Sequence, residues 1–212
     1  MSDVQPASAS APTAIRVVIA EDQAMVLEAL VALLERDRDI EVIAQVRNGR
    51  DAVQAVLDSA ADVLVADIEM PMMTGLEVLQ ALTGRSKTKV IIVTTFARPG
   101  YLHRALDAGA CGYLLKDSPA RELADAIRRV HGGQRVINPE LAAQAVSERD
   151  PLTDRERDVL RLAGDGVTSD DIAKRLGISS GTVRNHLSQA IGKLSATNRV
   201  EAARIARAKG WL

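Results

Sequence analysis

Short apolar segments alternate with helical patterns along the first part of the chain, and this order constrains the fold more than any other feature. The apolar segments are residues 15–20, 40–46, 63–66, 90–93 and 112–115, and the helical patterns are residues 23–36, 50–59, 75–82, 101–108 and 120–131. Strands and helices that alternate at this spacing form βαβ units on a parallel sheet. Both faces of such a sheet are covered, which agrees with the nearly continuous apolar character of the segments.

The rest of the chain has a different pattern and predicts a second domain. Residues 134–150 are irregular, so we expect a linker there, and residues 151–212 carry helical patterns throughout. Residues 151–212 hold 11 basic and 7 acidic residues, a net charge of +4, which leaves −5 for residues 1–150. A basic domain beside an acidic one indicates a nucleic-acid partner, although chance scatter of charges explains the difference about as well.

Composition and segment lengths argue against a disulfide-rich, zinc-binding or membrane protein. The chain has one cysteine, Cys111, and three scattered histidines, so neither a disulfide framework nor a zinc-ligand spacing is present. No apolar run approaches the roughly 18 residues of a membrane span. Residues 1–14 are rich in Ala, Ser and Pro and predict a disordered tail rather than a signal peptide. We therefore expect a cytoplasmic protein that does not insert into the membrane.

Five side chains that suit phosphoryl chemistry follow the ends of the predicted strands. Glu21 and Asp22 follow the first strand, Asp67 follows the third, Thr94 ends the fourth, and Lys116 follows the fifth. In a sheet of strand order 2-1-3-4-5 the first and third strands are neighbours, so the three carboxylates converge at one edge. Clustered carboxylates repel one another unless a hard cation such as Mg²⁺ compensates their charge. A single Asp at a strand end is more often a helix cap, but the five together describe a phosphoryl-transfer site.

The same segments resemble the receiver domain of two-component response regulators. The resemblance covers residues 15–133 and implies a flavodoxin-like fold with a five-stranded parallel sheet. It rests on Ile19-Ala20-Glu21-Asp22, Asp67-Ile68-Glu69-Met70-Pro71 with Gly75, Val93-Thr94-Thr95 and Gly112-Tyr113-Leu114-Leu115-Lys116-Asp117.

The resemblance to receiver domains also implies a role for each of these side chains. Asp67 is the phosphoryl acceptor, and a sensor histidine kinase is the donor. Lys116 and Thr94 contact the phosphoryl group, and Tyr113 moves with Thr94 as a switch. The ligands of Mg²⁺ are Glu21, Asp22, Asp67 and the backbone carbonyl of Glu69.

Residues 168–187 read as two short helices joined by a turn that contains Gly177. This is the layout of a helix-turn-helix motif, and a plain helical hairpin is the alternative. Residues 151–209 resemble the LuxR-type DNA-binding domain of the NarL and FixJ regulators. The resemblance rests on the segments Leu152-Thr153-Asp154-Arg155-Glu156 and Gly181-Thr182-Val183-Arg184-Asn185-His186. The resemblance implies that one group of residues reads base edges and another contacts phosphates. The first group is Arg184, Asn185 and Ser188, and the second is Thr182 and Lys193.

Two helices have features that the pattern does not settle. Residues 25–34 are apolar nearly all the way round, which fits either a deeply buried helix or a helix with a second face for self-association. Gly192 lies inside the second helix of the helix-turn-helix motif and costs roughly 1 kcal/mol of helix propensity, for which close packing is the expected reason.

We therefore expect a phosphorylation-activated transcriptional regulator, not an enzyme, that forms a homodimer or higher oligomer and binds double-stranded DNA. A closer resemblance to DesR-type regulators implies control of membrane-lipid desaturase genes. One alternative is a constitutive DNA-binding regulator whose receiver-like domain only dimerises. Another is a phosphatase with an aspartyl intermediate, although Glu21-Asp22-Gln23 lacks the Asp-x-Asp pattern usual in that class.

Overall fold

The structure is a computed structural model that describes residues 14–95, 99–139, 141–142 and 150–212. The chain forms two compact units. One contains the described residues up to Thr95 together with Ala105–Asn138, and the other contains Pro99–Arg104 and the described residues from Pro139 onward. Most of the predicted tail (residues 1–13) and part of the predicted linker (residues 140 and 143–149) lie outside the described residues. No helix in the described part of the chain is both long and apolar enough to cross a membrane.

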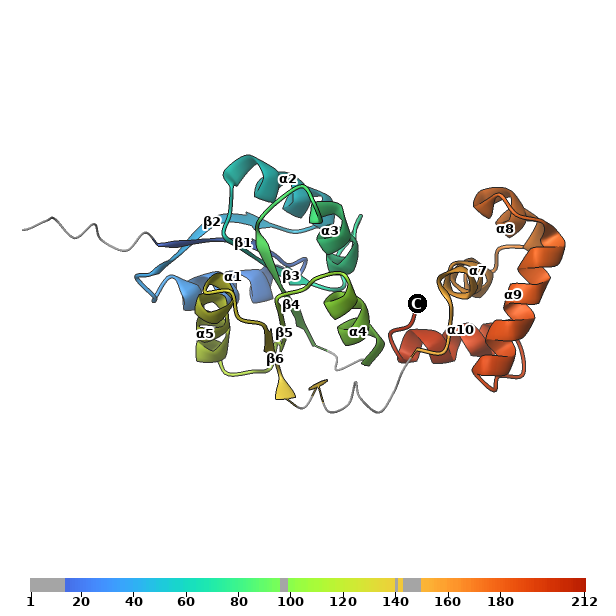
Figure 1. The fold of residues 1–212 in the computed structure, drawn as a ribbon. Helices are drawn as coiled ribbons and strands as arrows, with labels where there is room; N and C mark the ends of the chain where they lie inside the picture. The colour runs from blue at the N-terminus through green and yellow to red at the C-terminus, as the bar shows by residue number, and fades with distance from the viewer. Residues whose placement is uncertain (1–13, 96–98, 140, 143–149) are drawn as a thin grey trace, which may run out of the picture. The chain divides into compact units, whose positions relative to one another are not determined.

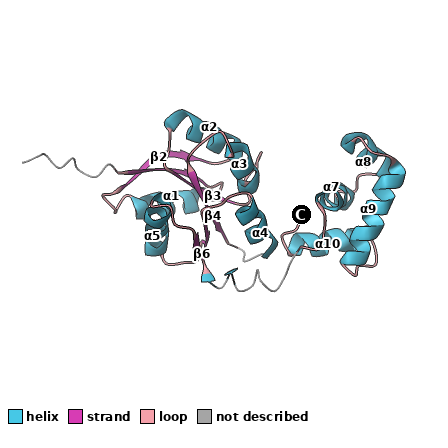
Figure 2. Cartoon of the chain, in the orientation of Figure 1, coloured by secondary structure: helices cyan, strands magenta, loops and turns pink. Residues whose placement is uncertain are grey.

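The first unit is a parallel sheet with helices on both faces, as predicted (Figures 1 and 2). The strand order is β2-β1-β3-β4-β5-β6, and every neighbouring pair is parallel. The elements in chain order are β1 (Ile15–Ala20), α1 (Ala24–Leu34), β2 (Ile40–Val46), α2 (Gly49–Ser59), β3 (Val63–Asp67), α3 (Gly75–Leu82), β4 (Lys89–Thr94), α4 (Pro99–Asp107), β5 (Gly112–Leu115), α5 (Ala120–His131) and β6 (Val136–Ile137).

The sheet has six strands, so the prediction of five was incomplete. The additional strand, β6, pairs with β5 through hydrogen bonds from the Val136 amide to the Cys111 carbonyl and from the Asn138 amide to the Tyr113 carbonyl. Residues 136 and 137 were expected to lie in the linker, because two residues are too few to show a strand periodicity.

Alternate residues of the central strands point to opposite faces of the sheet, and both faces are buried. One face packs against α1 and α5, and Figure 1 shows α2 and α3 on the other side. The core on the first face consists mainly of Val17, Ile19, Val63, Val65, Ile91 and Val93 from the strands and Leu27, Val31, Leu34, Ile127 and Val130 from the helices.

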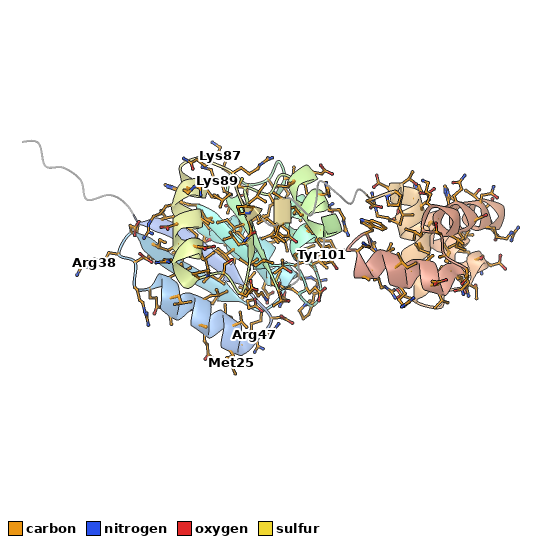
Figure 3. All side chains as sticks on the ribbon, turned by 90° about the horizontal axis from the view of Figure 1, so that it is seen from below. Met25, Arg38, Arg47, Lys87, Lys89 and Tyr101 are labelled. Carbon is orange, nitrogen blue, oxygen red and sulfur yellow. The ribbon has the colours of Figure 1, made fainter. Side chains whose placement is uncertain are left out.

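Helix α1 is not a deeply buried helix, although its sequence allowed that interpretation. It buries Leu27, Val31 and Leu34 against the sheet. Its other side is open to solvent: Met25 is 83% exposed and Ala29 is also exposed. Figure 3 shows Met25 at the surface of this helix. The apolar character of α1 therefore exceeds what the core of the unit requires.

From residue 150 onward, the second unit contains α7 (Asp154–Gly164), α8 (Ser169–Leu176), α9 (Ser180–Lys193) and α10 (Arg199–Ala208). Each helix begins at a side-chain cap, which accepts a hydrogen bond from a backbone amide of the first turn. The capping residues are Thr153, Thr168, Ser179 and Asn198. Gly177 ends α8 with φ +66°, a conformation that favours glycine.

Gly192 does not make a close contact, contrary to expectation. A Cβ atom added at this position would meet no atom within 4 Å. The residue is exposed near the end of α9, so packing does not explain the choice of glycine. Nothing else in the described structure explains it.

Candidate functional site

The carboxyl ends of β1, β3, β4 and β5 lie along one edge of the sheet and bring five predicted site residues to it. They are Glu21, Asp22, Asp67, Thr94 and Lys116. Carboxylate oxygens of the three acidic residues lie within 4.8 Å of one another. Glu21, Asp67 and Thr94 are buried. This edge therefore concentrates negative charge at low solvent exposure.

Asp67 lies at the last position of β3 and is 5% exposed. The backbone amide of Ile68 donates a hydrogen bond of 2.7 Å to its Oδ1 atom. The Nζ atom of Lys116 lies 3.0 Å from its Oδ2 atom. The carboxylate is thus fixed in orientation by two donors.

Lys116 is shared between two carboxylates. Its Nζ atom lies 2.6 Å from Glu21 Oε2 as well as 3.0 Å from Asp67 Oδ2. The side chain of Glu21 is fully buried, and the side chains of Lys116 and Asp67 are each 7% exposed. One ammonium group therefore compensates two buried negative charges, while Asp22 adds a third.

The pKa values of the buried groups show that this compensation is incomplete. Burial raises the pKa of Asp67 above its usual value, and the hydrogen bond from Lys116 reverses only part of that effect. Burial likewise raises the pKa of Glu21 against the opposing hydrogen bond from Lys116. Burial alone lowers the pKa of Lys116, but its bonds to Glu21 and Asp67 outweigh that effect and raise it. Further positive charge at this edge would stabilise the ionised carboxylates.

A divalent cation fits the oxygen atoms at this edge. The Oδ1 atom of Asp22 is buried, and no described residue donates a hydrogen bond to it. An unpaired buried carboxylate oxygen beside two further carboxylates is a ligand arrangement that suits a hard cation. Receiver-type acidic pockets typically bind Mg²⁺, and this cluster has the composition that such a pocket needs.

The loop after β3 holds Asp67 close to the start of α3. A Cβ atom added at Gly75 would lie 2.2 Å from the backbone oxygen of Asp67, so only glycine fits there. Thr74 caps α3 and forms a capping box with Glu77. Met72 in the same loop has φ +67°, which is unusual for a residue other than glycine. This loop also contains Glu69, the predicted carbonyl ligand.

Thr94 and Tyr113 lie on neighbouring strands beside the acidic cluster. Thr94 ends β4 and is 4% exposed, and Tyr113 on β5 is fully buried. The amide of Lys116 donates a hydrogen bond of 2.8 Å to the carbonyl of Thr94, which ties the end of β5 to the end of β4. Tyr113 and Thr94, the predicted switch residues, therefore lie on β5 and β4, and Lys116, the other predicted phosphoryl contact, directly follows β5.

Arg47 is a residue at this edge that the sequence did not reveal. Its Nη2 and Nε atoms donate hydrogen bonds of 2.8 Å and 3.2 Å to the backbone carbonyl of Asp22. The guanidinium group thereby holds the loop that carries Glu21 and Asp22. Only the pairing of β2 with β1 brings this arginine, which is 25 residues away in sequence, to the loop.

The second unit places the predicted base-reading residues on the exposed side of one helix. Arg184, Asn185 and Ser188 on α9 are exposed. The opposite side of α9 packs into the core through Val183, Leu187 and Ala190. Thr182 lies in the first turn, where its hydroxyl is 2.8 Å from that of the capping residue Ser179. An exposed polar face on the second helix of the motif is what entry into a DNA major groove requires.

Lys193, the other residue predicted to contact phosphate, lies at the opposite end of α9. Its Nζ atom is 2.7 Å from Oε2 of Glu156, a residue of α7 that is 2% exposed. Glu156 also forms a capping box with Thr153 at the start of α7. The ion pair with Lys193 had no sequence signal, because the two residues are 37 positions apart.

Two family models match the chain, one in each part. Residues 17–128 match the response regulator receiver domain, and residues 150–206 match the luxR family of bacterial regulatory proteins. These domains indicate a regulator rather than a classical enzyme. They also imply a histidine kinase as partner of the first domain and DNA as partner of the second.

Whole proteins of the same organisation are similar to this chain. The transcriptional regulatory protein YvfU of Bacillus subtilis is 52% identical over 199 residues, which cover 93% of this chain and 100% of that protein. DesR of the same organism is 51% identical over 197 residues, covering 93% and 98% of the two chains.

Solved structures show the same fold. The response regulator ChrA of a heme-sensing two-component system is 34% identical, with a TM-score of 0.57 over 94% of this chain and 99% of that chain. An RcsB–DNA complex, at 23% identity and a TM-score of 0.65 over 92% of this chain and 98% of that chain, shares the fold. Phosphorylation-dependent activation is the norm among such regulators. The chain therefore belongs to the two-component response regulators that join a receiver domain to a LuxR-type DNA-binding domain.

Proposed function

We propose that Asp67 accepts a phosphoryl group from a phosphohistidine of a sensor kinase. The observation that carries this proposal is the buried Asp67 carboxylate, which is oriented by the Ile68 amide and by Lys116 beside two further carboxylates. A carboxylate oxygen of Asp67 attacks phosphorus, the bond from phosphorus to the histidine nitrogen breaks, and the imidazole leaves with the electron pair and takes a proton from water. Catalysis of this step depends on positioning and on neutralising charge.

Lys116 and Thr94 are the side chains that we expect to contact the transferred group. Lys116 donates to a phosphoryl oxygen, because its ammonium group has three N–H donors and Glu21 and Asp67 account for two of them. Mg²⁺ would be held by Glu21, Asp22, Asp67 and the backbone carbonyl of Glu69, and it would supply the remaining positive charge. The unpaired Oδ1 atom of Asp22 supports this set of ligands.

Phosphorylation then changes the receiver surface through Thr94 and Tyr113. Thr94 moves toward the phosphoryl oxygens, and Tyr113 follows into the space that this movement opens. The change shifts an existing equilibrium toward a homodimer or higher oligomer. The exposed apolar side of α1 supports self-association, because a monomer has no need for it.

A dimer presents two copies of α9 to the two halves of a DNA site. Arg184, Asn185 and Ser188 contact base edges, and Thr182 contacts a phosphate. Arginine pairs naturally with guanine and asparagine with adenine. We place the receiver at residues 15–133, the linker at residues 134–150 and the DNA-binding domain at residues 151–212, with residues 136 and 137 added to the receiver sheet.

Control of membrane-lipid desaturase genes is a separate proposal that rests on the resemblance to DesR-type regulators. The chain is as similar to YvfU as to DesR, so the target genes need their own experiment. Sequencing of the genomic DNA bound by the phosphorylated protein tests this proposal, and binding sites away from lipid genes would contradict it.

Labelling of Asp67 tests the proposed function most directly. The full chain is incubated with Mg²⁺ and radioactive acetyl phosphate, and its mass in solution and DNA binding are measured before and after. We expect label on the wild type and on Asp58→Asn, an exposed carboxylate of α2, but none on Asp67→Asn. An unlabelled wild-type protein that still binds DNA would instead identify a constitutive regulator.

A further inference from the structure

Four polar or charged residues in the described part of the chain are buried as whole residues. Three of them, Glu21, Asp67 and Thr94, belong to the acidic cluster of the receiver. The fourth is Glu156 in the DNA-binding domain, which the proposed contacts with kinase and DNA do not use. A buried carboxylate is costly unless it is paired, so its partners indicate what it does.

Glu156 joins two helices. Its Oε2 atom accepts hydrogen bonds of 2.7 Å from the backbone amide of Thr153, before α7, and 2.7 Å from Nζ of Lys193, at the end of α9. Burial raises the pKa of Glu156, but the bonds from Lys193 and Thr153 outweigh this effect and leave it below its usual value. The carboxylate therefore stays ionised and paired at neutral pH.

Helices α7 and α9 also contribute to one apolar core cluster. It includes Val159 and Leu160 on α7 and Leu187 and Ala190 on α9. The hydrophobic effect is not directional, so apolar burial alone restricts the rotation of one helix against the other less sharply than a hydrogen-bonded ion pair does. An ion pair to a buried carboxylate tolerates little rotation, because a small displacement leaves the charge unpaired.

We infer that Lys193 is a positioning residue for DNA reading, which acts through Glu156 to fix the rotation of α9 and hence the direction of Arg184, Asn185 and Ser188. This inference rests on the proposed role of α9 in reading DNA. It assigns Lys193 a different role from the phosphate contact that the sequence suggested. Its ammonium group already has a carboxylate partner, and its side chain is only 37% exposed.

The two roles of Lys193 predict different measurements. Loss of a phosphate contact weakens binding to every DNA sequence. It also makes the slope of the logarithm of the binding constant against the logarithm of the salt concentration shallower by about 0.9. Loss of helix positioning weakens the preference for the correct sequence and leaves the salt dependence unchanged, since the number of phosphate contacts stays the same. A purely structural role would lower stability without changing the preference.

The experiment uses the full chain. A preferred DNA duplex is first selected from a random pool in two parallel selections, one with untreated protein and one with protein treated with Mg²⁺ and acetyl phosphate. Fluorescence anisotropy then gives affinities for this duplex and for a scrambled one at several salt concentrations. The variants are Lys193→Met, Glu156→Gln and the double variant. Lys87→Met removes an exposed lysine of the receiver and is the matched control for net charge.

We expect Lys193→Met and Glu156→Gln each to reduce the preference for the selected duplex roughly fivefold to tenfold, with an unchanged salt dependence. The double variant should be no worse than either single variant, because both remove the same pair. Uniform weakening on both duplexes with a shallower salt dependence in Lys193→Met alone would overturn the inference. An unchanged preference in both single variants would overturn it as well.

Failures at other steps are distinguishable. If Asp67 is never labelled, the duplex selected by the untreated protein still allows this test. If the wild-type protein selects no duplex, the proposed DNA reading by α9 fails, and the inference about Lys193 fails with it. If circular dichroism shows that Glu156→Gln is unfolded, Glu156→Asp replaces it. That variant keeps the charge but is one methylene group too short to reach both donors, so it should reduce the preference in the same direction.

Discussion

The Nζ atom of Lys116 lies 2.6 Å from Oε2 of Glu21, closer than the 3.0 Å that separates it from Oδ2 of Asp67. In the unphosphorylated protein, the shorter of the two contacts of Lys116 is therefore the one with Glu21 and not the one with Asp67, the proposed acceptor. The first role of Lys116 is to make a cluster of buried carboxylates compatible with folding. Contact with a phosphoryl group is the second role that we propose for it, through the third N–H donor of the ammonium group.

We predict that Lys116→Met lowers the free energy of unfolding of the receiver by roughly 3 kcal/mol in the absence of divalent cations, because Glu21 loses its partner while fully buried. Urea unfolding followed by circular dichroism measures this change. Added Mg²⁺ should restore part of the loss, since a bound cation replaces the missing charge. A loss no larger than that of Lys87→Met, an exposed lysine of the same domain, would show that the ion pair is dispensable.

Gly75→Ala should damage both stability and phosphorylation. The added methyl group would lie 2.2 Å from the backbone oxygen of Asp67, so α3 or the end of β3 must shift. Such overpacking typically costs about 1–3 kcal/mol, and here it also displaces the acceptor. Urea unfolding gives the first effect and the initial rate of labelling by acetyl phosphate gives the second. Normal labelling in this variant would contradict the tight contact.

Gly192→Ala should have the opposite effect on stability. This position lies within α9, and an added Cβ would meet no atom within 4 Å. The substitution should stabilise the DNA-binding domain by up to about 1 kcal/mol through helix propensity. The fluorescence of Trp211, the single tryptophan of the chain and a buried residue of this domain, reports its unfolding. A lower unfolding midpoint would reveal a constraint on Gly192 that the structure does not show.

The contribution of Glu156 to stability should depend on pH in a defined direction. Its pKa in the folded protein is below the ordinary value of 4.5, so its stabilisation is complete above pH 4.5 and decreases as the pH falls through the folded-state value. Wild type and Glu156→Gln should therefore differ by roughly 2 kcal/mol at neutral pH and converge in acid. Unfolding by urea, followed through Trp211, measures the difference. A constant difference down to acidic pH would exclude the ion pair as its source.

Arg184→Ala should relax specificity more than it weakens binding. If Arg184 contacts a guanine, its removal costs about 1–3 kcal/mol on the selected duplex and abolishes the preference at one base pair. Selection repeated with the variant shows which position is lost. Arg199→Ala, on α10, removes the same charge outside the reading helix and should leave the base preferences unchanged. Identical base preferences in wild type and Arg184→Ala would exclude base contact by Arg184.

Most secondary structure was predictable because local signals agreed with the final packing. The segments 15–20, 40–46 and 112–115 are strands with the predicted bounds, and α3 and α5 also have the predicted bounds. The order of parallel strands then determined which strand ends meet at one edge, so the positions of Asp22, Asp67 and Lys116 followed from topology. Strand β6 was missed because its pairing depends on contacts with β5 and not on any pattern in its own two residues.

The details of the site that escaped prediction all depend on side chains meeting across long sequence separations. The bond from Arg47 to the Asp22 carbonyl requires β2 to lie beside β1, and the pair of Glu156 with Lys193 requires α7 to pack on α9. The preference of Lys116 for Glu21 depends on side-chain length and rotamer, which the residue types alone do not specify. Topology thus predicts which groups assemble, and packing decides which of them form bonds.

Because β6 pairs with β5, Tyr113, the proposed switch residue, lies on an interior strand. Tyr113 is aligned with Ile92 on one side and Ile137 on the other, and its carbonyl accepts a hydrogen bond from Asn138. Sliding or peeling of β5 would break bonds along both of its sides. If Tyr113 acts as the proposed switch, reorientation of its ring about its side-chain bonds preserves this pairing, whereas a shift of the β5 backbone breaks it.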